Sequence, residues 1–141
     1  MNKSTDELMN ILKSKKTYEE FFEEEVGELC FSTVSEYLNL LVTEKKLKKS
    51  DIIQRANLDK NYAYQIFNGT KTNPSRDKII MLAFGMSLNL NETRKLLRLS
   101  QLKDLYIRDP RDSVIIFCLN KGYNLMQANE FLNDYGLNCF E

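Results

Sequence analysis

LKKSDIIQRANLDKNYAYQIFNG, residues 47–69, contains two short runs with helical periodicity on either side of a tight turn. In the first run the apolar residues that share one side are Ile52, Ile53 and Ala56. Asn57 tolerates the left-handed conformation that such turns often need, and Asp59 is a good N-cap for the second run. The second run ends before Gly69, a common C-terminal signal. We therefore expect two short helices joined by a turn of about three residues.

This arrangement is a helix-turn-helix, in which small or apolar residues lie where the helices cross and polar residues cover the outer face of the second helix. The residues that fit the crossing are Ala56, Leu58, Ala63 and Ile66. The residues expected to face outward are Lys60, Asn61, Tyr64, Gln65 and Asn68. Their ammonium, amide and hydroxyl groups are of the kind that hydrogen-bond to base edges and phosphates. The pattern favours a surface that binds duplex DNA.

The longer segment 47–97 resembles the Cro/C1-type helix-turn-helix domain, also called the xenobiotic-response-element family. The resemblance is carried by Gln65-Ile66-Phe67-Asn68-Gly69, followed by Lys71 and Pro74-Ser75. It implies a compact, all-α domain of five helices that binds specific double-stranded DNA sequences, with the recognition helix, about 60–67, in the major groove. Transcriptional regulation is the function that this implies. The flanking sequences are similar to those of small bacterial proteins described as helix-turn-helix regulators.

The resemblance also implies a role for individual residues. Those expected to contact bases are Lys60, Asn61 and Gln65, joined by the outward-facing Tyr64. Those expected to contact the DNA backbone are Lys49, Tyr62, Asn68 and Lys71. Three positions depart from the family pattern: Asn57 replaces a turn glycine, Ile53 replaces a small residue, and Phe67 replaces a polar one. Phe67 could pack against another part of this chain or against a partner.

Charge is distributed unevenly, although the 20 basic residues equal the 20 acidic ones. Residues 1–43 carry a net charge of −5, residues 44–78 carry +5, and the remainder is balanced. The basic segment could neutralise several phosphates. We interpret the acidic run 19–28 as a solvated helix face with its apolar side turned inward. A second hypothesis is that this acidic segment folds over the basic helix and masks it, so that deleting residues 1–30 would tighten DNA binding.

The composition argues against an enzyme. The chain has no histidine, which excludes Ser–His and Cys–His catalysis and every zinc site with a histidine ligand. Cys30, Cys118 and Cys139 are far apart and form no CxxC pair, and no glycine-rich phosphate loop is present. We therefore expect no catalytic residues, metal or cofactor. The odd cysteine number without a secretory signal favours a cytoplasmic protein, and the apolar runs 79–86 and 114–119 are too short to span a membrane.

The second half of the chain contains an internal repeat with an offset of 35 residues. The matching features are Arg76-Asp77 with Arg111-Asp112, the apolar run 79–84 with 114–119, and the capping pair Asn89/Glu92 with Asn124/Gln127. The repeat predicts two similar, stacked helical hairpins, and a chance similarity between two amphipathic hairpins is the alternative.

Ser35 is expected to cap a helix that runs to about Leu47. Its residues available for burial are Leu38, Leu40, Leu41 and Leu47. These features suggest three parts: an acidic helical extension (1–33), a Cro/C1-type domain (34–102) and a C-terminal hairpin packed on it (103–141).

Specific binders with a single recognition helix usually dimerise, so we expect a homodimer with the repeat region as its candidate contact. The alternative function is a protein-interaction adaptor or antitoxin-like partner that uses the same scaffold without reading DNA. The acidic N-terminal segment or the C-terminal hairpin would then hold the protein partner, and the acidic charge and Phe67 motivate this alternative.

Overall fold

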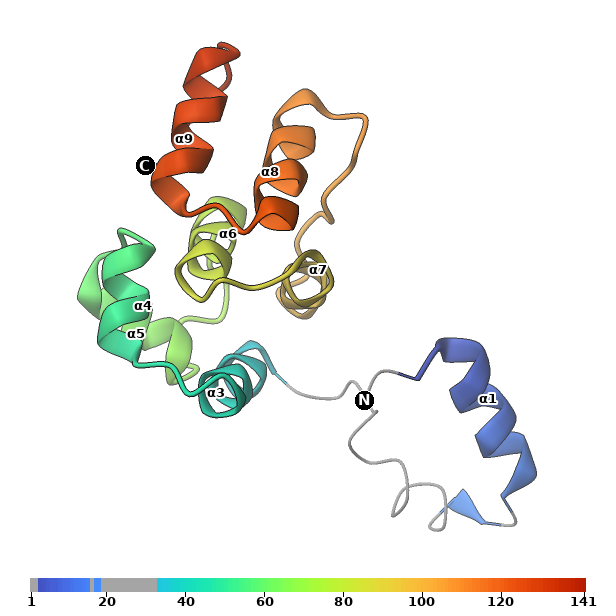
Figure 1. Cartoon of the computed structure of the whole chain (residues 1–141). Helices are drawn as coiled ribbons and strands as arrows, with labels where there is room; N and C mark the ends of the chain where they lie inside the picture. The colour runs from blue at the N-terminus through green and yellow to red at the C-terminus, as the bar shows by residue number, and fades with distance from the viewer. Residues whose placement is uncertain (1–2, 16, 19–32) are drawn as a thin grey trace. The chain divides into compact units, whose positions relative to one another are not determined.

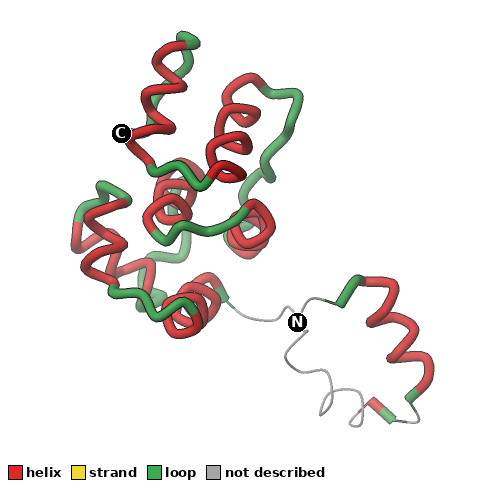
Figure 2. The backbone as a smooth tube through the Cα atoms, viewed as in Figure 1, coloured by secondary structure: helices red, strands yellow, loops and turns green. Residues whose placement is uncertain are grey.

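The computed structural model describes residues 3–15, 17–18 and 33–141, and these residues form helices and loops without any strand (Figures 1 and 2). The predicted all-α fold is confirmed. The chain divides into two compact units, Met1–Phe31 and Ser32–Glu141. The helix described in the first unit is α1 (Thr5–Ser14). The helices of the second unit are α3 (Val34–Glu44), α4 (Lys49–Arg55), α5 (Lys60–Phe67), α6 (Arg76–Gly85), α7 (Leu90–Leu99), α8 (Pro110–Lys121) and α9 (Leu125–Asp134).

Helix α6 lies at the centre of the second unit. Every residue from Ile79 to Gly85 is buried, so the helix is apolar on all sides and must be covered all round. Helices α4, α7 and α9 each pack against it. Within this unit, α6 and α7 form a middle layer, with α3–α5 on one side and α8–α9 on the other (Figure 1). One hydrophobic core includes residues from all three layers.

Helix α4 crosses α6 at very short range because position 85 is a glycine. A Cβ atom at Gly85 would lie 2.6 Å from the backbone oxygen of Ile52 and 2.8 Å from the Cβ of Ala56. Ala56 is itself fully buried, as are Ala63 and Ile66 on α5, the second helix of the predicted helix-turn-helix. The residues predicted for this crossing are thus buried, with the exception of the half-buried Leu58.

The 35-residue repeat is present in the backbone as well as in the sequence. Helices α7 and α9 both begin with a complete capping box, formed by Asn89 with Glu92 and by Asn124 with Gln127. The loop inside each hairpin turns through a left-handed residue at the matching position, Ser87 with φ 54° and Gly122 with φ 72°. The loops that leave the hairpins do the same at positions 101 and 136. The prediction of two similar hairpins is confirmed.

The two hairpins hold each other by crossed ion pairs. Arg76 donates to both carboxylate oxygens of Asp112, at 3.1 and 2.9 Å, and Arg111 donates to both oxygens of Asp77, at 2.9 and 3.1 Å. In each copy the arginine Nε also donates to a loop carbonyl, at 2.9 and 2.8 Å. An exchange in which each copy gives its arginine to the other copy's aspartate is typical of a twofold contact. The hairpins are therefore related by an approximate twofold axis.

Helix α3 differs from its prediction at both ends. The predicted cap Ser35 is wrong, because Thr33 caps the helix by accepting the N–H of Glu36 at 3.2 Å. The helix ends at Glu44, where the chain turns through the left-handed residue Lys46, and not near Leu47. Leu40, which we expected to be buried, is exposed.

Candidate nucleic-acid interface

The predicted pair of short helices is present as α4 and α5. The first begins at Lys49. Asn57 adopts the left-handed conformation in the turn, with φ 53°, and the Asp59 carboxylate accepts the N–H of Tyr62 at 3.0 Å. Helix α5 ends after Phe67, as predicted. Local turn chemistry therefore determines where α4 ends and where α5 begins.

Helix α5 buries one side and exposes the other. Its buried residues are Ala63, Ile66 and Phe67. Of the four predicted base-contacting residues, Lys60, Asn61 and Gln65 are exposed and Tyr64 is half-buried. Because residues three or four positions apart share a helix face, the structure brings these four side chains together on one accessible surface.

Two side chains of α3 hold the C-terminal end of α5. Ser35 Oγ and Asn39 Nδ2 both donate to the carbonyl oxygen of Phe67, the latter at 2.8 Å. Such carbonyls at the end of a helix have no partner within the helix, so these bonds satisfy a group that would otherwise be orphaned. Sequence reasoning missed both residues. Nothing in their local pattern separates them from ordinary polar residues on an amphipathic helix.

Phe67, the most unusual residue of the predicted motif, packs inside this chain. Its side chain is almost completely buried, and Lys49 Nζ lies 5.2 Å from the centroid of its ring. Of the two possibilities raised by the sequence, packing against this chain is the one observed. Phe67 thus positions the predicted backbone-contacting Lys49 by a cation–π contact.

The other predicted backbone-contacting residues gather around the end of α5. Lys71 Nζ lies 5.6 Å from the centroid of the half-buried Tyr62 ring, and the Tyr62 hydroxyl accepts the N–H of Ser75 at 3.4 Å. Asn68 is exposed, and its Oδ1 accepts the N–H of Thr70 at 2.9 Å. The Asn68 amide nitrogen is left as a donor toward solvent.

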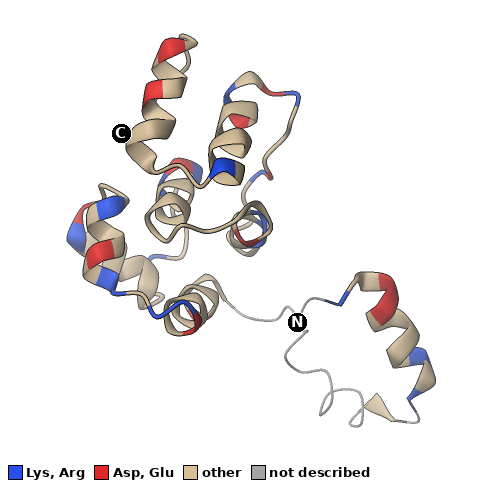
Figure 3. Ribbon diagram, viewed as in Figure 1, with Lys and Arg blue, Asp and Glu red and all other residues tan. Residues whose placement is uncertain are grey.

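Most of the positive charge of segment 44–78 is not neutralised within the described part of the chain. Lys45 pairs with Glu92 at 3.2 Å, Arg76 pairs with Asp112, and Lys78 donates to the Glu141 carbonyl at 2.6 Å. The six other cations make no ion pair with any described residue: Lys46, Lys48, Lys49, Arg55, Lys60 and Lys71. Figure 3 shows basic residues on α4 and on the loop that leads into it. We call these six residues the basic surface.

Within the part of the chain that the structure describes, the cysteines and acidic side chains form no second candidate site. Cys118 is buried, and burial raises the pKa of its thiol, so it is a core residue and not an activated nucleophile. Cys139 donates its thiol to the Asn129 carbonyl at 3.4 Å. Among the described residues, no group of three or more cysteine or carboxylate side chains could hold a metal ion. None of the helices described is long and apolar enough to cross a membrane.

Cys30 and the acidic run 19–28 lie outside the described residues. The masking hypothesis therefore stays a prediction.

No protein family, curated protein or solved structure matches this chain. The Cro/C1 resemblance stays a prediction that depends on the residues quoted for it.

Proposed function

We propose that this protein binds specific double-stranded DNA sequences through α5 and thereby regulates transcription. The observation that carries the proposal is the accessible polar row Lys60, Asn61, Tyr64 and Gln65, on a helix whose opposite side is anchored in the core. Lys60 also belongs to the basic surface, whose other cations lie on the loop ahead of α4, on α4 itself and after α5.

The dimensions and chemistry of α5 suit the major groove. An α-helix with its side chains is about 10–12 Å in diameter, and the major groove is about 12 Å wide. The amides of Asn61 and Gln65 can form paired hydrogen bonds with adenine, and the Lys60 ammonium can donate to guanine. The anchoring of the Phe67 carbonyl by α3 keeps the row in one orientation, which reduces the entropy lost on binding.

Contacts to phosphates would come from both ends of the helix pair. Lys49 begins α4 and lies against the ring of Phe67, the last residue of α5, while Asn68 and Lys71 follow that helix. Lys49 and Lys71 each rest on an aromatic ring, which limits the conformations that their side chains must give up on binding.

The test begins with selection of bound duplexes from a random DNA pool by the full chain. We expect an enriched sequence, and we expect Lys60→Ala with Asn61→Ala to lose about 1–3 kcal/mol of discrimination for each base contact removed. A matched control is Lys103→Ala with Asn91→Ala, because both residues are exposed and lie outside α4 and α5.

Failure to enrich any sequence, or selectivity that survives the Lys60/Asn61 change, would count against the proposal. Either result would favour the adaptor alternative, in which the same scaffold binds a protein. Circular dichroism of both double variants should match the wild type, since all four side chains are exposed.

A further inference from the structure

The two hairpins are similar in sequence and backbone, but their outer faces differ in how far they are buried. In the first hairpin, Ile79, Leu82 and Leu96 are fully buried, and the hairpin is covered by the α3–α5 layer. The offset of 35 residues places Val114, Phe117 and Phe131 at the corresponding positions of the second hairpin. There Phe117 is 43% exposed, and the other two are only half-buried. Within the unit Ser32–Glu141, no layer covers this face.

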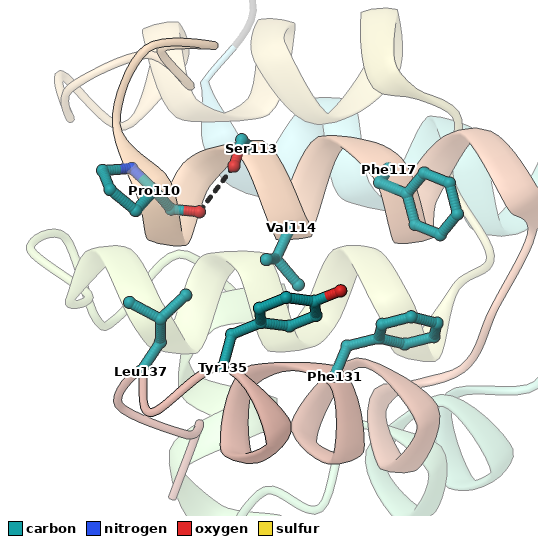
Figure 4. A pocket seen from close by; sticks show the side chains of 7 residues that line it. All are labelled: Pro110, Ser113, Val114, Phe117, Phe131, Tyr135 and Leu137. Carbon is teal, nitrogen blue, oxygen red and sulfur yellow. Dashed lines mark hydrogen bonds between the residues drawn. The ribbon is translucent and has the colours of Figure 1, made fainter.

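The uncovered face is an apolar groove of about 460 Å³ between α8 and α9. Figure 4 shows Val114 and Phe117 on one wall and Phe131 and Tyr135 on the other, with Leu137 at one end. Tyr135 is 71% exposed. Exposed apolar surface of this kind, gathered in one patch, is typical of a binding face.

The groove is held in shape by ring contacts of its own. Phe131 stacks on Tyr123 with ring centroids 5.7 Å apart, and Phe117 meets both rings edge-on, at 5.6 and 6.1 Å. Such contacts fix the side chains before a partner arrives, so little conformational entropy is lost on binding.

The two ends of the groove carry opposite charges. At one end Lys121 Nζ lies 5.6 Å from the centroid of the Phe117 ring. At the other end Asp134, in the last turn of α9, directly precedes the lining residue Tyr135 but does not itself line the groove. Both residues are exposed, and neither makes an ion pair with a described residue.

The other charged groups near the Asp134 end leave its charge available. Arg111 is held by Asp77, and the exposed Arg108 is followed directly by Asp109. The side chain of Asp109 caps α8 by accepting the N–H of Asp112. One end of the groove is therefore basic and the other is acidic.

We infer that this groove binds the same groove of a second copy of the chain. A twofold axis that crosses the centre of the groove at right angles to its length sets the Lys121 end of each copy against the Asp134 end of the other, and the apolar walls cover each other. The crossed Arg–Asp pairs between the hairpins are a precedent within the chain for this kind of contact. The inference goes beyond the proposed DNA binding and does not depend on it.

The first experiment measures the dimer dissociation constant of the full chain by sedimentation equilibrium, with Tyr135→Ser as the test variant. Serine is the residue that the repeat places at the matching position, Ser100, so the variant copies a side chain that the fold already accepts. The control is Met126→Asn, which copies Asn91. Met126 is 70% exposed on the same helix but does not line the groove.

We expect the wild type to dimerise, Tyr135→Ser to weaken the dimer about tenfold or more, and Met126→Asn to leave it unchanged. A wild-type chain that stays monomeric at high concentration would overturn the inference. An equal effect of the two substitutions would overturn it as well.

The second experiment reverses the charges at the ends. Lys121→Glu and Asp134→Lys should each weaken the dimer about tenfold, because each like-charge contact occurs twice across a twofold axis. The double variant restores an opposite-charge pair and should recover most of the affinity. Failure of the double variant to recover would show that the groove serves a different occupant.

DNA binding separates this inference from the proposed function. A monomeric Tyr135→Ser variant keeps α5 intact and should still bind duplex DNA, whereas the Lys60/Asn61 variant should lose selectivity and still dimerise.

Discussion

Gly85 determines how closely α4 approaches the central helix. A methyl group there would lie 2.6 Å from the backbone oxygen of Ile52, which cannot rotate away as a side chain could. We predict that Gly85→Ala lowers the free energy of unfolding by about 1–3 kcal/mol, the usual cost of overpacking. Urea unfolding followed by circular dichroism measures this change. The exposed Asn91→Ala serves as control and should stay within about 0.5 kcal/mol of the wild type. Equal stability of Gly85→Ala and wild type would show that the helices separate at no cost.

Single residues of the candidate site were predictable where their roles are local. Asn57 and Asp59 act within three residues of their own positions, so turn and capping preferences identify them. Asn39 and Ser35 act on a carbonyl about 30 residues away, in Phe67. No local pattern specifies a contact over that distance, and the sequence led us to treat Ser35 as a cap.

The crossed ion pairs between α6 and α8 allow a matched comparison of two helix contacts. Both pairs are bidentate with the same distances, but the Asp112 side chain is 3% exposed and the Asp77 side chain is 42% exposed. Asp112 also accepts the N–H of Tyr106 at 3.0 Å. We predict that Asp112→Asn costs about 2–4 kcal/mol, because it leaves the partly buried charge of Arg76 unpaired. Asp77→Asn should cost less than about 1 kcal/mol, as is usual for exposed pairs.

Thermal and urea unfolding of the two variants at neutral pH measure the difference. Equal losses would show that burial does not control the strength of these contacts.

The helices themselves were largely predictable, and the way they face each other was not. Hydrophobic periodicity and the capping pairs at Asn89 and Asn124 locate the hairpins closely. The same repeat does not indicate which sides of the hairpins meet. From the sequence alone, Arg76 and Arg111 could equally be solvent-exposed residues. Only the twofold relation shows that each pairs with an aspartate of the other hairpin.

The intact protein has no net charge, yet we expect its DNA binding to depend strongly on salt. The six cations of the basic surface would displace counterions locally, whatever the total charge. If three to six of them reach phosphates, a plot of log affinity against log salt concentration should have a slope of about −3 to −5. Lys49→Ala and Lys71→Ala should each reduce this slope by about 1, and Lys103→Ala should leave it unchanged. A slope near zero in the wild type would contradict the phosphate contacts.

The charge pattern along the chain was readable from the sequence, but the uncovered groove was not. Both hairpins have similar apolar positions, so the sequence does not indicate which copy α3–α5 would cover. Only the packing shows that the first copy is enclosed and the second is open at Phe117 and Tyr135.

The repeat gives the chain a second hairpin whose outer face supports no other layer of its unit. The copy that supports α3–α5 is constrained, because α4 packs on α6 and α3 packs on α7, so that changes there would disturb the layer that contains α5. The second hairpin, α8–α9, carries no further layer of its unit on its outer side. Its outward residues can therefore vary, and even exchange one partner for another, while the helix proposed to recognise DNA stays as it is. The two hairpins thus divide two tasks between them. The first supports the α3–α5 layer, and the second leaves a face free to bind a partner.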